Sequence, residues 1–119
     1  MSDKRTTWNS YASAWKEAST QGKVAALRRS VSPTCVYQDP LTIVKGHDEL
    51  IAYMLAFHQQ VPGGHFMTTW FLAHHDVSIA KWNMVSGDGT AIGDGVSYGQ
   101  YNEQGMLVGM TGFFDTPPQ

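Results

Sequence analysis

One carboxylate in this chain, that of Asp39, has neighbours that could make it an acid–base catalyst. It follows Val36 and Tyr37, two residue types that favour a β-strand, within residues 34–41. Pro40 holds the residue before it in an extended backbone conformation. A carboxylate at a strand end, among apolar and aromatic neighbours, loses part of its hydration, which is how an aspartate becomes a usable general base. An Asp-Pro turn, in which the carboxylate only accepts hydrogen bonds from nearby amides, explains the same residues equally well.

The five histidines raise the question of a metal site. His74 and His75 are neighbours on a predicted strand, so their side chains should point to opposite faces and cannot easily share one ion. We place His47 and His58 on helix surfaces, and His65 after a Pro-Gly-Gly turn. The sequence therefore predicts no bound metal.

The spacing of apolar residues divides the chain into a helical half and a strand half. A stripe at helical spacing predicts a first helix, which Gly22 separates from a second short helix; the stripe consists of Trp8, Tyr11, Ala12, Trp15 and Ala18. Residues 33–39 and 41–44 follow as strands, and a third helix extends from about residue 47 to the Pro-Gly-Gly at 62–64. Four strand-length runs then predict an antiparallel sheet: residues 65–73, 76–85, 91–101 and 106–114. This order predicts an α+β fold with the helices on one face of the sheet.

Glycines interrupt the last two of these strands, although glycine weakens strand pairing and usually marks a bend, a bulge or space left for something else. We therefore predict a strongly curved sheet that encloses a hollow. Strand alternation puts two sets of residues on one face: Ser97, Gly99 and Tyr101, then Met110, Gly112 and Phe114. If that face is concave, the hollow suits a small, mostly apolar organic ligand.

Length and composition limit the possible functions. We expect residues 1–119 to form one domain with its core at about 8–115, and a net charge of −2 without a basic run disfavours nucleic-acid binding. The single cysteine, Cys35, cannot form an internal disulfide, so a reducing compartment fits best. No targeting segment and no membrane-length apolar run is readable. These features are typical of a cytoplasmic protein without a membrane partner.

Several short motifs occur in a specific order along the chain. They are Tyr11-x-x-Ala14-Trp15, Tyr37-x-Asp39-Pro40, a turn at Gly46, His74-His75-Asp76, Lys81-Trp82, and Thr111-Gly112-Phe113-Phe114-Asp115 after Gly105. Together they resemble the nuclear-transport-factor-2-like (cystatin-like) proteins, and among these the SnoaL-like proteins, which are named for a polyketide cyclase. The resemblance implies a cone-shaped, curved antiparallel sheet packed against three helices, and a homodimer formed through the outer sheet face. It does not specify a reaction, because this fold hosts isomerases, cyclases, dehydratases and non-catalytic binders.

Three residues match functional positions of the related ketosteroid-isomerase branch. Asp39 matches an aspartate before a proline that removes a proton from carbon. Tyr11 falls near a tyrosine that donates to the developing oxyanion, and Ser97 stands where that branch has a protonated aspartic acid. A serine hydroxyl still donates a hydrogen bond, although it is the weaker acid. The other cavity residues that we predict are Trp15, Leu41, Met54, Phe57, Trp82, Tyr101, Met110 and Phe114.

These observations favour a cofactor-free enzyme that isomerises or cyclises a carbonyl or polyketide-like compound. Asp39 would move the proton, Tyr11 would polarise a carbonyl, and Ser97 would shape the site. Two alternatives stay open. One is a non-catalytic module that binds a small apolar molecule or serves dimerisation; the other is a dehydratase in which a histidine pairs with Asp39, as in scytalone dehydratase. The candidate histidines are His65, His74 and His75.

Overall fold

The structure, a computed structural model, describes residues 3–115, which contain three helices and six strands. The helices are α1 (Lys4–Lys16), α2 (Thr20–Ser30) and α3 (Gly46–Gln60). The strands are β1 (Val31–Asp39), β2 (Thr42–Lys45), β3 (His65–His74), β4 (Val77–Val85), β5 (Ala91–Tyr101) and β6 (Leu107–Phe113). Every predicted element is present, which confirms the α+β fold class.

The break between the first two helices is not at Gly22. That residue lies in the first turn of α2, and the helix begins after Ser19, whose side-chain oxygen accepts a hydrogen bond from the Gly22 N–H at 3.0 Å. A Cβ at residue 22 would lie 2.5 Å from the Glu17 carboxylate. Gly22 is therefore part of the helix start and not the break between the two helices.

All six strands form one sheet, in the order β2-β1-β6-β5-β4-β3. Four neighbouring pairs are antiparallel, but β1 and β6 run parallel to each other. The prediction of a purely antiparallel sheet is therefore wrong at this pair. The pairing places Gln38 opposite Thr111 and joins the two halves of the chain, so no local sequence pattern reports it.

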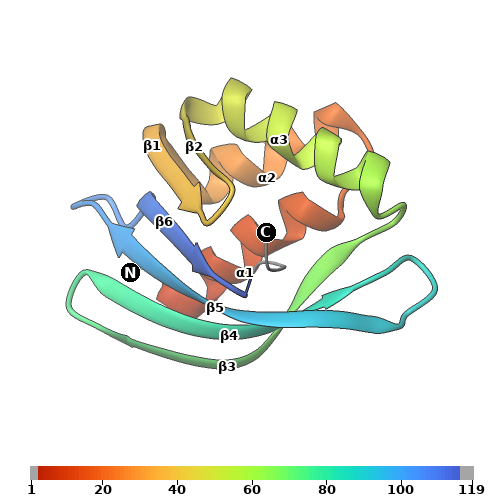
Figure 1. The fold of residues 1–119 in the computed structure, drawn as a ribbon. Helices are drawn as coiled ribbons and strands as arrows, with labels where there is room; N and C mark the ends of the chain where they lie inside the picture. Colours follow the sequence, from red (N-terminus) through yellow and green to blue (C-terminus); the bar gives the residue numbers. More distant parts are fainter. Residues whose placement is uncertain (1–2, 116–119) are drawn as a thin grey trace.

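The sheet is strongly curved, as predicted, and the three helices lie on its concave side (Figure 1). The pairing register shifts between Thr68 and Trp70 on β3, and again between Met84 and Val85 on β4. Irregularities of this kind bend a strand and increase its twist. They help to wrap the long strands β3, β4 and β5 around the helices.

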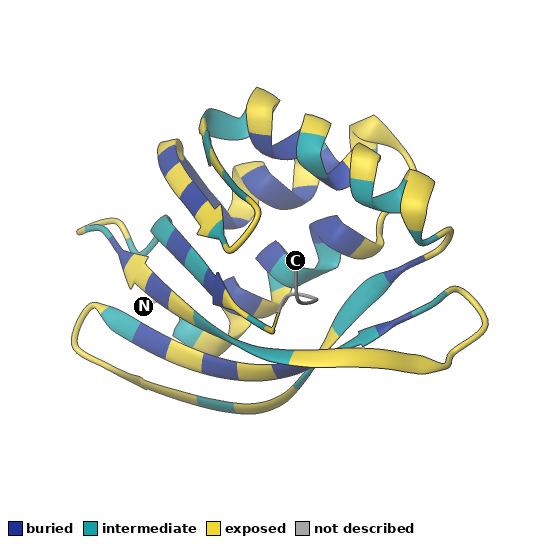
Figure 2. Cartoon of the chain, in the orientation of Figure 1, coloured by how far each residue is buried: buried dark blue, intermediate teal, exposed yellow. Residues whose placement is uncertain are grey.

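Buried and exposed residues alternate along the strands of the sheet (Figure 2). Along β4, Ser78, Ala80 and Trp82 are buried, whereas Ile79 and Lys81 between them are exposed. The buried set faces the helices. The helices complete the core with Trp8, Tyr11, Ala14, Trp15, Ala26, Leu27, Leu50, Ile51 and Met54.

The C-terminal end of α1 is fixed by a buried charge. The Lys23 ammonium donates hydrogen bonds to the carbonyls of Ala14 at 3.0 Å and Glu17 at 2.6 Å, and its side chain is fully buried. His58 Nε2 contacts the Trp15 and Gly64 carbonyls, so Nε2 carries the hydrogen and Nδ1 can accept from Lys23 at 3.4 Å. The prediction that His58 lies on a helix surface is therefore wrong, because it links α3 to α1 and α2.

Candidate functional site

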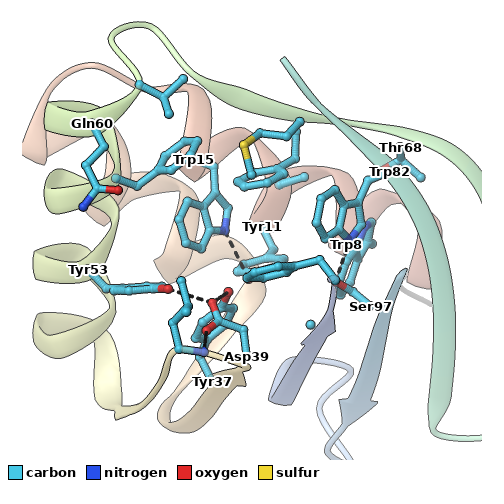
Figure 3. A pocket seen from close by; sticks show the side chains of 18 residues that line it. Trp8, Tyr11, Trp15, Tyr37, Asp39, Tyr53, Gln60, Thr68, Trp82 and Ser97 are labelled. Carbon is cyan, nitrogen blue, oxygen red and sulfur yellow. Dashed lines mark hydrogen bonds between the residues drawn. The ribbon is translucent and has the colours of Figure 1, made fainter. Parts of the chain in front are cut away.

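A cavity of about 250 Å³ lies on the concave side of the sheet, lined by residues from α1, α3 and the strands (Figure 3). Half of its 18 lining residues are aromatic. Its volume is slightly below the range of roughly 300–1,000 Å³ that is usual for ligand pockets. The lining residues are Trp8, Tyr11, Ala12, Trp15, Tyr37, Asp39, Leu41, Tyr53, Phe57, Gln60, Val61, Phe66, Thr68, Trp82, Met84, Ser97, Gly112 and Phe114.

Asp39 lies at the wall of this cavity and accepts three hydrogen bonds. Its Oδ2 accepts from the hydroxyls of Tyr37 at 2.6 Å and Tyr53 at 2.8 Å, and its Oδ1 accepts from the Leu41 N–H at 2.8 Å. Strand alternation places Tyr37 on the same face of β1 as Asp39, and α3 supplies Tyr53. The carboxylate is half-buried and held in position, and Oδ1 keeps one of its two acceptor positions. Both predicted features, the cavity wall and the backbone-bonded turn, are thus present together.

Tyr11 supplies a neutral hydrogen-bond donor to the same cavity. Its hydroxyl accepts a hydrogen bond from Trp15 Nε1 at 3.1 Å, across one turn of α1. Burial raises the pKa of Tyr11 well above its ordinary value, so the hydroxyl stays protonated. Within residues 3–115 this hydroxyl donates to no acceptor. Its hydrogen is therefore available to a molecule in the cavity.

Ser97 on β5 is held in a similar way by a second tryptophan. Trp82 Nε1 on β4 donates to Ser97 Oγ at 2.9 Å, and Ser97 lies directly opposite Gly112 on β6. Because the indole N–H occupies the oxygen as an acceptor, the serine hydroxyl has its own hydrogen left to donate. The three predicted catalytic residues, Asp39, Tyr11 and Ser97, thus line one cavity.

The cavity walls are held by contacts between aromatic rings. The ring centroid of Trp15 lies 5.2 Å from that of Phe66 and 5.6 Å from that of Phe57, both edge-on. Phe66 in turn meets Trp82 edge-on at 4.9 Å. Aromatic pairs of this geometry add about 0.5–1.5 kcal/mol each beyond the area they bury. A wall of this kind presents flat faces on which a planar ligand can stack.

Five of the eight predicted ligand-binding residues line the cavity: Trp15, Leu41, Phe57, Trp82 and Phe114. The other three, Met54, Tyr101 and Met110, do not line it. Met54 and Met110 are fully buried in the core, and the Tyr101 hydroxyl bonds to Ser78 at 2.8 Å. Tyr101 and Met110 are on the predicted face of the sheet, but that part of the face is packed against the helices, and Met54 belongs to the packed core of α3.

The sequence interpretation missed Tyr37 and Tyr53, the two donors to Asp39. The signal was present, because Tyr37 is two residues before Asp39 on a strand and Tyr53 lies four residues before Phe57 on the buried side of a helix. The remaining lining residues that it did not assign to the cavity are Trp8, Ala12, Gln60, Val61, Phe66, Thr68, Met84 and Gly112.

None of the five histidines lines the cavity. His74 and His75 are exposed at the end of β3, and their Nδ1 atoms lie 3.2 Å apart because His75 adopts a left-handed backbone conformation with φ of 49°. The prediction that they point to opposite faces is therefore wrong. Within residues 3–115 the hydrogen-bond partners of Asp39 are Tyr37, Tyr53 and Leu41 and include no histidine, so the His–Asp pair of the dehydratase alternative is not formed there. Within residues 3–115, no three His, Cys, Asp or Glu side chains are grouped so as to hold a metal ion.

Comparison with known protein families identifies the class to which this curved sheet with three covering helices belongs. The SnoaL-like domain matches residues 12–110, so the chain belongs to that family. A comparison with curated proteins gave no match. None of the helices in the described part of the chain is long and apolar enough to cross a membrane.

Solved structures similar to this chain confirm its fold. A proposed isomerase of the SnoaL-like family from Agrobacterium tumefaciens strain C58 is 24% identical, with a TM-score of 0.87 over 98% of this chain and 100% of that one. A proposed SnoaL-like polyketide cyclase from Jannaschia sp. CCS1 is 15% identical, with a TM-score of 0.77 over 97% and 93%. A protein with a cystatin-like fold from Methylobium petroleophilum PM1 is 11% identical, with a TM-score of 0.78 over 98% and 78%. At these identities the similarity establishes the fold and not the reaction.

Proposed function

We propose that this protein is a cofactor-free acid–base enzyme, an isomerase or cyclase that acts on a small carbonyl or polyketide-like compound in the cavity. The proposal rests on one observation: a fixed carboxylate, that of Asp39, and a neutral hydrogen-bond donor, the Tyr11 hydroxyl, line the same aromatic cavity. The proposed isomerase from A. tumefaciens and the proposed cyclase from Jannaschia support the same reaction classes.

In this mechanism Asp39 removes a proton from the carbon beside a carbonyl group. The electron pair of the broken C–H bond forms an enolate, and Tyr11 donates a hydrogen bond to the enolate oxygen. Return of the proton from Asp39 to another carbon completes an isomerisation. If the enolate carbon instead attacks a second carbonyl carbon of the same molecule, a ring closes and Asp39 returns the proton to the new alkoxide. Tyr37 and Tyr53 keep the carboxylate in place throughout.

Hydrogen–deuterium exchange tests the proton transfer directly. Cyclic enones and aryl ketones are incubated with the protein in D₂O, and loss of the signal of the hydrogens next to the carbonyl is followed by NMR. Replacing Asp39→Asn should slow the protein-dependent exchange by at least about 100-fold, the contribution typical of a general base. Asp94→Asn is the matched control, because Asp94 is exposed on β5 and does not line the cavity. Equal exchange rates with wild type and with Asp39→Asn would contradict the proposal.

The three hydrogen bonds on Asp39 favour a second candidate, a non-catalytic module that binds a small molecule in the same cavity. Phenols resemble an enolate, so thermal shifts with 2-naphthol separate the two candidates. If the Asp39 carboxylate faces the ligand, Asp39→Asn should be stabilised more than wild type, because the naphthol oxygen no longer meets a negative charge. Equal stabilisation of both proteins, with no exchange in D₂O, identifies a binder.

We also propose that two copies of the chain associate through the convex face of the sheet, an assembly that the resemblance implies. Large apolar side chains are exposed there on adjacent strands, with Leu72 opposite Ile79 and Ile79 opposite Tyr98. A patch of this kind on a sheet usually marks an interface. Analytical ultracentrifugation should find a dimer, and Ile79→Lys should convert it to a monomer. A monomeric wild type would contradict the assembly.

A further inference from the structure

Most of the strand glycines in the curved part of the sheet are explained by packing. A Cβ at Gly95 would lie 2.5 Å from the Trp82 ring, and one at Gly99 would lie 2.7 Å from the Ser78 hydroxyl. At Gly109 the Gln100 side chain would be 2.5 Å away. At each of these positions a neighbouring side chain occupies the space that the glycine leaves.

Gly112 is different, because the protein leaves its space empty. A Cβ there would lie 3.5 Å from Asp39 Cβ and 3.8 Å from both Ser97 Oγ and the Tyr37 hydroxyl, all ordinary van der Waals distances. A methyl group would therefore fit without moving any atom. The residue is buried and lies within β6, one position before its end, and a glycine in a strand weakens it. Packing does not require a glycine here, whereas close approach of a ligand to the backbone would.

The position of Gly112 in the sheet puts it between the proposed catalytic groups. β6 is flanked by β1, which carries Asp39 and Tyr37, and by β5, which carries Ser97. Gly112 itself lines the cavity. The backbone at residue 112 is thus the floor of a narrow slot, with Asp39 on one side and Ser97 on the other.

We infer that this slot, defined by Asp39, Gly112 and Ser97, admits the edge of a flat ring, so that the substrate is a planar cyclic carbonyl compound rather than an open, branched chain. The inference rests on the proposed function and names its substrate class. A ring C–H next to a carbonyl can lie on bare backbone between the base and a hydroxyl donor, while the ring faces meet the aromatic walls. A tetrahedral carbon with bulky substituents needs more than the single methyl-sized space that Gly112 leaves.

Filling the slot with one methyl group tests the inference. We expect Gly112→Ala to weaken binding of 2-naphthol about tenfold in titration calorimetry, which is about 1.4 kcal/mol, because the added methyl group overfills the occupied slot. Gly93→Ala is the matched control: Gly93 is an exposed strand glycine outside the cavity, and its Cβ would meet only Met84, at 3.9 Å. It should change the affinity less than about twofold. The melting temperatures of both variants show that they fold.

Two results would overturn the slot: equal affinity of wild type and Gly112→Ala for 2-naphthol, or no binding of 2-naphthol by the folded wild type. A different combination of results would contradict the proposed function and leave the slot intact. Binding that Gly112→Ala weakens but that Asp39→Asn leaves unchanged, together with no exchange in D₂O, supports the slot and removes the catalytic role of Asp39.

Discussion

The two ends of the concave sheet face carry similar residues but differ in whether the helices fill the space above them. At the packed end, Leu107 and Met110 are fully buried, and the hydroxyls of Ser78 and Tyr101 bond to each other. Lys4, at the start of α1, lies over the Tyr101 ring. At the open end, Ser97 and Gly112 border the cavity instead. Residue type alone therefore does not decide between core and site; the cover supplied by the helices does.

The hydroxyl groups show the same contrast at the level of single hydrogen bonds. At the packed end, the hydroxyls of Ser78 and Tyr101 form a hydrogen bond with each other. At the open end, the oxygens of Tyr11 and Ser97 each accept from an indole N–H, that of Trp15 or Trp82. An oxygen that accepts in this way directs its own hydrogen elsewhere, and hydrogen bonds in a chain polarise one another. Two tryptophans thus prepare two donors for a ligand.

The largest expected effect is on stability, and it separates the two ends. Met110→Ala should lower the free energy of unfolding by about 2–5 kcal/mol, because a fully buried side chain leaves a cavity. Phe114→Ala, at the open end, should cost only about 1 kcal/mol, since that ring is partly exposed and already borders empty space. Urea unfolding measures both. Equal losses would show that the open end is packed as tightly as the other.

A second prediction concerns alkaline pH. Burial raises the pKa values of Tyr11, Tyr37 and Tyr53 in the folded protein, whereas a tyrosine in the unfolded chain ionises near pH 10. Above about pH 10 these tyrosines lose their protons in the unfolded chain but keep them in the folded protein, so the free energy of unfolding falls as pH rises. Below about pH 10 their contribution to folding stability is fully present. Each tyrosine contributes up to about 1.4 kcal/mol per pH unit.

Tyr11→Phe tests this contribution at the open end. The variant should lose less stability than wild type between about pH 10 and pH 11, and the two proteins should respond alike below about pH 9. Urea unfolding at a series of pH values gives both curves. Curves that stay parallel over the whole range would mean that Tyr11 ionises in the folded state as easily as in the unfolded chain.

The smallest expected effect is that of removing one indole N–H. Trp82→Phe keeps a ring at the wall but takes the donor away from Ser97, so 2-naphthol should bind about threefold to tenfold more weakly, the value of one hydrogen bond. Trp70→Phe is the control, because Trp70 is exposed and does not line the cavity. Titration calorimetry compares the three proteins, and unchanged affinity in Trp82→Phe would refute the role of the indole.

Local patterns were sufficient to predict the helices, the strands and the concave face. That Asp39, Tyr11 and Ser97 share one cavity was implied by the resemblance to the ketosteroid-isomerase branch, whereas the local periodicities contain Tyr37 and Tyr53. They could not separate Met110, which is covered, from Phe114, which is not, because both fall on the same face of the predicted strand 106–114. That distinction depends on where the helices end. The parallel pairing of β1 with β6 depends on contacts between distant residues and was missed for the same reason.

The parallel pair also fixes when the site can exist during folding. The helices and the β3–β4–β5 strands form largely through contacts between neighbours in the chain, whereas Gln38 and Thr111, which bond across β1 and β6, are 73 residues apart. Contacts between residues so far apart form late in folding, because closing a long loop costs more conformational entropy. A nascent chain that ends before β6 therefore holds Asp39 but lacks the strand that carries Gly112, so the site is complete only once β6 has paired with β1 and β5.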